Sequence, residues 1–162
     1  MTALLSSAAA LVAAVSAVAV WWLRARMVVV RVEGASMEPT LHGDERVIVR
    51  RLRLDRLRTG QIIVVERPIW QDRWTWSQTR GAVRRRRWIV KRLAALPGEC
   101  VPEALARFDA VPPGFGLVLG DNTRASTDSR EFGPVPLDRV LGVAVRRFGR
   151  GGAFPDSAPA AP

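Results

Sequence analysis

Few residue types in this chain could do chemistry, and one serine and one lysine stand out among them. Ser36 lies in the stretch Gly34–Leu41 (GASMEPTL), between small residues and shortly before a proline. Of the 25 basic residues, all but Lys91 are arginine. Arginine keeps its proton in proteins, whereas a desolvated lysine can lose its proton and act as a base. We therefore interpret Ser36 as a candidate nucleophile and Lys91 as its candidate general base.

The composition limits the alternatives. The single histidine, His42, follows Ser36 by six residues in an expected surface turn, and it stays open as an alternative base. The single cysteine, Cys100, excludes an intramolecular disulfide framework and a cysteine-rich metal site, and one histidine excludes a multi-histidine metal centre. Tyrosine is absent, so tyrosine-based chemistry is excluded. We expect no metal and no cofactor.

To act as a base near neutral pH, Lys91 needs a pKa roughly three units below the usual value of about 10.4. Burial supplies such a shift when acids stay out of contact. The apolar neighbours Trp88, Ile89, Val90 and Leu93 favour burial. An exposed strand lysine is the alternative interpretation.

The N-terminal segment is apolar. Residues 1–23 carry no charge, and about 20 such residues suffice to cross a bilayer. Trp21 and Trp22 follow as interfacial aromatics, and then come Arg24 and Arg26. This pattern predicts one transmembrane helix as a membrane anchor over residues 1–26. A cleaved secretory signal, which normally begins with basic residues, and a buried helix are the alternatives.

The remainder predicts a mainly β domain over residues 27–148. Short β-branched or apolar runs recur between Gly, Pro and Asp turns, and no amphipathic helix is evident after residue 27. The tail, residues 149–162, is rich in Gly, Ala and Pro and is predicted to be disordered. The expected strands are Met27–Val32, Arg46–Arg50, Gln61–Val65, Trp88–Leu93, Phe115–Leu119 and Val140–Val145.

An insertion at residues 69–87 combines Trp70, Trp74 and Trp76 with the run Arg84–Arg87. The alternation over Arg73–Ser77 is typical of one face of a hairpin. A solvated loop, a membrane-surface contact and nucleic-acid binding all suit this composition. The net charge of +10 likewise suits anionic lipid, nucleic acid or simple solvation.

Four segments in order resemble the motifs of type I signal peptidases, including bacterial enzymes and mitochondrial inner-membrane peptidases. Gly34–Leu41 resembles the serine motif, and Gly60–Val65 resembles the central strand motif. Val90–Arg92 with Leu96–Glu99 resembles the lysine motif. The last motif is matched by Gly120–Asn122, Ser126, Asp128, Ser129, Arg130 and Phe132–Pro136. The segments span residues 32 to 136.

The resemblance implies a signal-peptidase-like β-fold with Ser36 as nucleophile and Lys91 as general base. It implies that Ser126 hydrogen-bonds the lysine amine, and that Asp128 and Arg130 form a supporting ion pair. Asp121 and Asn122 would shape the turn that leads to Ser126.

The resemblance also implies that the backbone N–H of Ser36 is one oxyanion donor. Some relatives add a serine hydroxyl two positions before the nucleophile. Gly34 occupies that position here, so this side-chain donor is missing.

Substrates of the resembled family bind by strand addition, with shallow pockets for small side chains. Val32, Met37, Leu41 and Val90 are the expected pocket walls, and cleavage is expected after an Ala-X-Ala type segment. The expected partners are secreted or membrane preproteins with signal peptides and the lipid bilayer, and no nucleic acid.

The expected location is the cell membrane, single-pass, with the catalytic domain on the extracytoplasmic side. The arginines after the apolar run favour the opposite orientation by the positive-inside rule.

Three other functions are open. The enzyme could be dedicated to one secreted precursor. A self-cleaving regulator can share Ser-Lys chemistry, but it needs an N-terminal DNA-binding unit in place of the apolar segment. A non-catalytic basic membrane- or nucleic-acid-binding module would leave Lys91 and the group Ser126, Asp128 and Arg130 unexplained.

Overall fold

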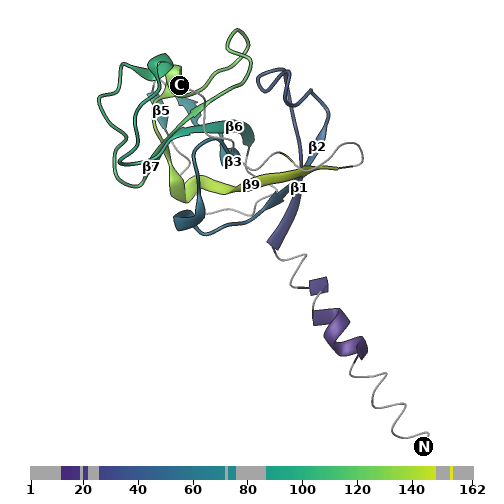
Figure 1. Ribbon diagram of the computed structural model, residues 1–162. Helices are drawn as coiled ribbons and strands as arrows, with labels where there is room; N and C mark the ends of the chain where they lie inside the picture. The colour runs from purple at the N-terminus through teal and green to yellow at the C-terminus, as the bar shows by residue number, and fades with distance from the viewer. Residues whose placement is uncertain are drawn as a thin grey trace, which may run out of the picture.

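Seven antiparallel strands form one curled sheet in the computed structural model of this chain (Figure 1). The structure describes residues 12–18, 20–21, 26–71, 73–75, 87–148 and 154. The strand order in the sheet is β1-β2-β9-β3-β6-β7-β8. The strands are β1 (Met27–Arg31), β2 (Arg46–Arg50), β3 (Ile62–Glu66), β6 (Trp88–Ala95), β7 (Phe115–Leu119), β8 (Val135–Pro136) and β9 (Val140–Arg147).

The central strand is β3, which is buried along its whole length and pairs with β6 and β9. Alternate side chains of a strand point to opposite faces. Accordingly Ile62 and Val64 join one hydrophobic cluster, whereas Ile63 and Val65 join another. Its near-continuous apolar sequence is explained by this burial on both faces.

Three irregularities in strand register accompany the curl. They lie at Ile48/Val49 between β2 and β9, at Val64/Val65 between β3 and β9, and between Leu93 and Ala95 on β6 against β7. Such bulges bend strands and increase their twist. The sheet is therefore strongly bent, and clusters of buried residues pack on both of its faces.

The mainly β prediction is confirmed, and the strand ends differ from it by one or two residues. Four short helical segments were not predicted, because single turns carry no helical periodicity. They are η1 (Leu54–Arg56), η3 (Glu103–Leu105), α2 (Ser129–Phe132) and η4 (Leu137–Arg139).

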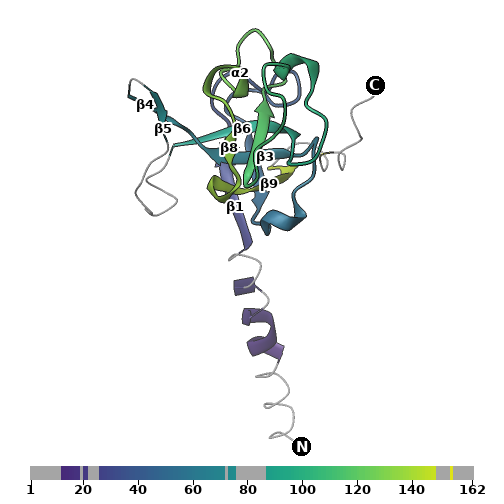
Figure 2. The same ribbon diagram turned by 90° about the vertical axis from the view of Figure 1, so that its left-hand side faces the viewer.

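Part of the insertion is a hairpin. β4 (Ile69–Gln71) pairs with β5 (Arg73–Thr75), as the alternation over Arg73–Ser77 predicted for its first residues. The hairpin projects to one side of the main sheet (Figure 2). The remaining insertion residues, 76–86, lie outside the described part of the chain.

At the N-terminus, residues 12–18, 20 and 21 are helical and extend away from the β domain (Figure 1). Their large side chains are exposed, with Trp21 at 70%. Within the described residues, no helix combines the length and apolar content needed to cross a membrane. Much of the expected anchor, residues 1–26, and all of the expected tail, residues 149–162, except Phe154 lie outside the described residues.

Candidate active site

Ser36 lies in the turn between β1 and β2, and two buried neighbours fix this turn to the core. Met37 and Leu41 are fully buried, and the backbone N–H of Leu41 donates to the carbonyl of Met37 at 2.8 Å. Burial of each of these apolar side chains stabilises the folded state by about 2 kcal/mol and thereby holds the loop against the core. The peptide bond between Glu38 and Pro39 in this loop is cis.

The other candidate, Lys91, lies at the middle of β6, opposite Ile63 of the central strand. Its side chain is buried, with 3% of the residue exposed. Nζ donates a hydrogen bond of 2.8 Å to Oγ of Ser126. Desolvation by burial lowers the pKa of Lys91 to about 8, although the carboxylates of Asp128 and Glu131 oppose this by raising it. A lysine with this pKa is partly neutral near physiological pH.

Ser36 and Lys91 line the same pocket, although they lie 55 positions apart in the chain. Its cavity volume is about 190 Å³. The apolar part of its lining includes Ile89, Pro68 and Phe132. The tertiary structure thus brings the proposed nucleophile and the proposed base to one open site.

Ser126 connects the lysine to a buried carboxylate. Its hydroxyl donates to Oδ2 of Asp128 at 2.7 Å, and Arg130 pairs with Asp128 through Nε at 2.9 Å and Nη2 at 2.8 Å. The ion pair expected between Asp128 and Arg130 is therefore present. Acids were expected to stay out of contact with Lys91, but the Asp128 carboxylate is separated from its amine by the Ser126 hydroxyl alone.

Asp128 is held as a carboxylate. Its complete burial works to raise its pKa, but hydrogen bonds from the Arg130 side chain, the Gly120 N–H, Ser126 and the Arg130 N–H outweigh this and lower it to about 2. Asp128 also caps helix α2. Its side chain accepts from the Arg130 N–H, and Glu131 accepts from the Asp128 N–H at 2.7 Å.

Gly120 begins the loop that carries Ser126 (residues 120–128, the Ser126 loop). At this position the Ser126 loop meets the loop that carries Ser36 (residues 34–41, the serine loop). A Cβ at this position would overlap the Ser126 hydroxyl and would lie 2.5 Å from the Ser36 carbonyl oxygen. Its N–H donates to Oδ2 of Asp128 at 2.9 Å. No residue with a side chain fits without displacing one of these groups.

The next two residues hold the serine loop. Asn122 donates from its backbone N–H to the Ser36 carbonyl and from Nδ2 to the Ala35 carbonyl, both at 3.1 Å. Asp121 accepts two hydrogen bonds from Arg92, at 2.8 and 2.7 Å. Burial works to raise the pKa of Asp121, but hydrogen bonds from Arg92 and Thr40 lower it. Asn122 therefore joins the Ser126 loop to the serine loop, and Asp121 joins it to strand β6. These contacts go beyond the role in a turn that was expected of the two residues.

Comparison with known proteins then identifies the family. The model of the family described as "Signal peptidase, peptidase S26" matches residues 4–103 and 102–148. The chain belongs to this signal peptidase family.

Individual proteins to which the chain is similar are also membrane proteases or signal peptidases by name. The chain is 32% identical over 126 residues to the mitochondrial ATP-independent inner membrane protease subunit 1a of Arabidopsis thaliana, covering 72% of this chain and 67% of that protein. It is 34% identical over 121 residues to the mitochondrial inner membrane protease subunit 1 of Xenopus tropicalis, covering 70% of this chain and 64% of that protein. It is 42% identical over 48 residues to signal peptidase IB of Staphylococcus aureus, covering 30% of this chain and 25% of that protein.

The four residues expected to form substrate pockets in this signal peptidase family member lie in one hydrophobic cluster. Val32, Met37, Leu41 and Val90 are at most 7% exposed and belong to the same buried cluster. The residues that line the open pocket around Ser36 are others, among them Gly34, Ala35 and Ile89. The role of the four as walls for substrate side chains stays a prediction.

Gly34 lines the pocket with a positive φ of 77°, where a Cβ would meet no atom within 4 Å. Space therefore exists for the serine that some relatives carry, although the backbone conformation favours glycine.

His42, the alternative base, is not among the residues that line the pocket of Ser36. Its side chain is 61% exposed, and its Nδ1 lies 3.6 Å from Oε1 of Glu38.

Sequence reasoning missed the close approach at Gly120 and the Arg92–Asp121 pair. A glycine or an ion pair that acts between distant loops leaves no local pattern. The capping box of α2 was recoverable, because an Asp followed three positions later by a Glu is its sequence signature.

Proposed function

We propose that this protein is a membrane-bound serine endopeptidase that removes signal peptides from secreted preproteins, with Ser36 as nucleophile and Lys91 as general base. The observation that carries the proposal is the amine of Lys91, which is buried, bonded to Ser126 and open to the same pocket as Ser36. Membership of the signal peptidase family supports the reaction class.

In this mechanism the neutral amine of Lys91 takes the proton from the Ser36 hydroxyl while Oγ attacks the scissile carbonyl. The N–H of Ser36 donates to the oxyanion that develops. As the C–N bond breaks, protonated Lys91 gives its proton to the leaving amine. Lys91 then takes a proton from a water molecule, whose oxygen attacks the acyl ester. As the ester C–O bond breaks, Lys91 returns the proton to Oγ of Ser36, which restores the free hydroxyl and the neutral amine. Ser126 positions the amine, and Asp128 with Arg130 holds Ser126.

The substrate would bind as an added strand along the serine loop, with small side chains at the first and third positions before the cut. A pocket of about 190 Å³ suits small residues such as alanine. We propose Val32, Met37, Leu41 and Val90 as the apolar base of these pockets. Cleavage of a single precursor from a panel would instead assign the enzyme to one dedicated substrate.

We further propose that residues 1–26 anchor the protein in the membrane, that residues 27–148 form the extracytoplasmic peptidase domain, and that residues 149–162 are a disordered tail. The exposed apolar side chains of the N-terminal helix support anchoring. Protease added to intact spheroplasts should degrade the domain. A domain that is protected until the membrane is opened would place it in the cytoplasm.

The test of the chemistry uses the full chain in neutral detergent and a peptide with an Ala-X-Ala segment. Ser36→Ala and Lys91→Arg should each abolish cleavage, since alanine cannot attack and guanidinium cannot accept the proton. His42→Ala is the matched control and should cleave normally. Cleavage by Lys91→Arg, or its loss in His42→Ala, would refute the Ser-Lys dyad.

A further inference from the structure

A second pocket shares no lining residue with the pocket of Ser36 and is lined mainly by arginine. Its cavity volume is about 360 Å³, and the described residues that line it include no acid. They are Arg26, Arg50, Arg51, Leu52, Arg56, Arg58 and Gln61. Positive charges that line one hollow repel one another, and an anion that enters the hollow reduces this repulsion.

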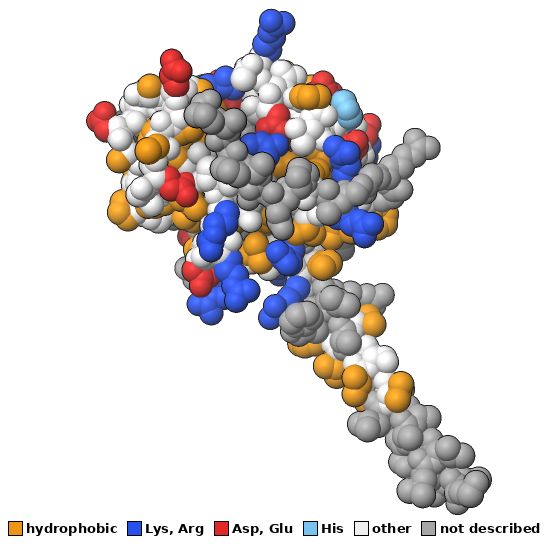
Figure 3. All heavy atoms as spheres, in the orientation of Figure 1, with side chains coloured by type: hydrophobic (Ala, Val, Ile, Leu, Met, Phe, Trp, Pro, Cys, Tyr) orange, Lys and Arg blue, Asp and Glu red, His pale blue; other side chains and the backbone are white. Residues whose placement is uncertain are grey.

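The pocket lies at the end of the sheet where the N-terminal segment joins the domain. Met27, the first residue of β1, pairs with Arg50 at the end of β2, and the Arg51 N–H donates to the Arg26 carbonyl at 2.9 Å. Arginine side chains gather on this underside of the domain, beside the N-terminal helix (Figure 3). The pocket therefore lies next to the point where β1 begins, beside the N-terminal segment.

Contacts with neighbouring residues hold the guanidinium group of one of these arginines and the backbone of two others. Arg58 donates from Nη1 to the Leu57 carbonyl at 2.9 Å, and its backbone N–H donates to Oε1 of Gln61 at 3.0 Å. The Arg50–Arg51 backbone packs closely over Gly142 of β9, where a Cβ would overlap the Arg50 carbonyl. The neighbouring acid, Asp55, pairs with Arg53, which lies outside the lining. A cluster of arginines of this kind suits a phosphodiester, whose two non-bridging oxygens share one negative charge.

Exposed apolar side chains next to the pocket favour a lipid headgroup over free phosphate as the anion. Leu54, in the turn η1 between Arg53 and Arg56, is 45% exposed, and Met27 is 41% exposed. Apolar side chains beside arginines suit the boundary between lipid headgroups and acyl chains. Free phosphate would gain nothing from them.

We infer that this arginine pocket binds the phosphodiester headgroup of an anionic phospholipid in the membrane that the N-terminal segment enters. The inference rests on the membrane anchoring proposed above, and it is independent of the peptidase chemistry. Headgroup binding would hold the domain against the bilayer at a fixed orientation.

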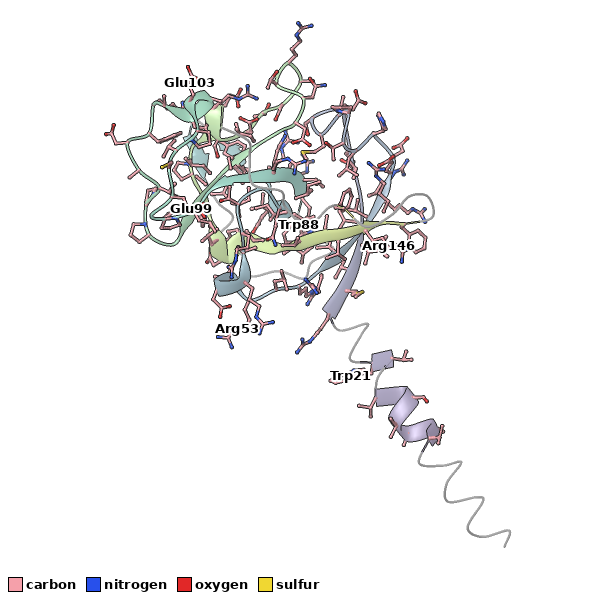
Figure 4. All side chains as sticks on the ribbon, in the orientation of Figure 1. Trp21, Arg53, Trp88, Glu99, Glu103 and Arg146 are labelled. Carbon is pink, nitrogen blue, oxygen red and sulfur yellow. The ribbon has the colours of Figure 1, made fainter. Side chains whose placement is uncertain are left out.

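The test counts lipids bound to the full chain in neutral detergent by native mass spectrometry, with phosphatidylglycerol and phosphatidylcholine as probes. Arg51→Ala/Arg56→Ala should bind phosphatidylglycerol about 25-fold more weakly, from roughly fivefold for each arginine, and should bind phosphatidylcholine as the wild type does. The matched control, Arg46→Ala/Arg146→Ala, removes the same charge from the opposite ends of β2 and β9 and should bind like the wild type. Figure 4 shows how far Arg146 lies from Arg53 on the underside.

Three results would overturn the inference. Equal binding of the two lipids by the wild type would deny headgroup selectivity, and equal losses in both double variants would show that only overall charge matters. Inorganic phosphate that binds as tightly as phosphatidylglycerol would assign the pocket to free phosphate. If a variant misfolds, the wild type still decides, because its preference for phosphatidylglycerol should fall as salt rises. Ser36→Ala should bind lipid normally, so a failure of peptide cleavage and a failure of lipid binding are distinguishable.

Discussion

Nζ of Lys91 donates to the Ser126 hydroxyl at 2.8 Å, and that hydroxyl donates to Asp128 at 2.7 Å. The lysine is therefore subject to two opposed effects. Burial favours the neutral amine, whereas the nearby carboxylate favours the ammonium ion. The balance leaves the pKa of Lys91 at about 8, which is low enough for a base and sensitive to each neighbour.

The rate of peptide cleavage should rise with pH through one ionisation near pH 8, as Lys91 loses its proton. Below that pH, kcat/KM should fall about tenfold for each pH unit, since only the neutral amine can accept the serine proton. The measurement is kcat/KM for an Ala-X-Ala peptide from pH 6 to 10. A flat profile over this range would contradict a lysine base.

Asp128→Asn should move the midpoint of this profile to lower pH. The substitution removes the negative charge that raises the pKa of Lys91 and leaves the Arg130 charge that lowers it. The maximal rate should fall by about 10- to 100-fold, because Ser126 and Arg130 lose their charged partner. The control is Asp138→Asn, whose carboxylate is exposed on the surface, and it should leave the profile unchanged. A midpoint that stays or rises in Asp128→Asn would show that this carboxylate does not act on Lys91.

Gly120→Ala should remove most activity and lower the free energy of unfolding by about 2 kcal/mol, because the added methyl must displace the Ser126 hydroxyl or the Ser36 carbonyl. Urea unfolding and peptide cleavage measure the two effects. Gly43→Ala is the comparison. A Cβ there would lie 3.5 Å from the Gly34 carbonyl oxygen, an ordinary contact, so both quantities should stay near those of the wild type. Wild-type activity in Gly120→Ala would mean that the two loops are not held at this glycine.

The stability of the protein should carry a signature of the buried lysine. The pKa of Lys91 is about 8 in the folded state against an ordinary 10.5, so the unfolded state binds more protons between these values. Stability from this group is therefore lowest below pH 8 and rises as the pH increases to 10.5.

Lys91→Met removes the titrating group but keeps a long apolar side chain. The Tm of the variant minus that of the wild type should be most positive at pH 7 and should decrease towards pH 10.5. Thermal unfolding of both proteins at several pH values measures it. A difference that is constant across this range would show that the amine is not desolvated.

The interior of the fold could be predicted where a residue acts on its own segment. The apolar run at Gln61–Val65 predicted a strand, and the structure has strand β3 at Ile62–Glu66, buried at every position. Val32, Met37, Leu41 and Val90 were expected to form the walls of the substrate pockets. The structure places them in one buried cluster, and their role towards the substrate stays a prediction. Whether they meet the substrate depends on the bound strand, which a local pattern does not contain.

By itself the sequence determined the kinds of chemistry that this protein can do: a single lysine among arginines, a serine between small residues, and the ordered motifs around them. These features depend on residue type and local spacing, which the chain carries directly. Only the tertiary structure decided that Ser36 and Lys91 share one pocket and that Gly120 and Asn122 join the serine loop to the Ser126 loop. It also decided that five arginines line one pocket at the end of the sheet where the N-terminal segment joins the domain. These relationships join segments that are distant in the chain, and they arise when strands β2, β9, β3 and β6 pair and bend around a common core.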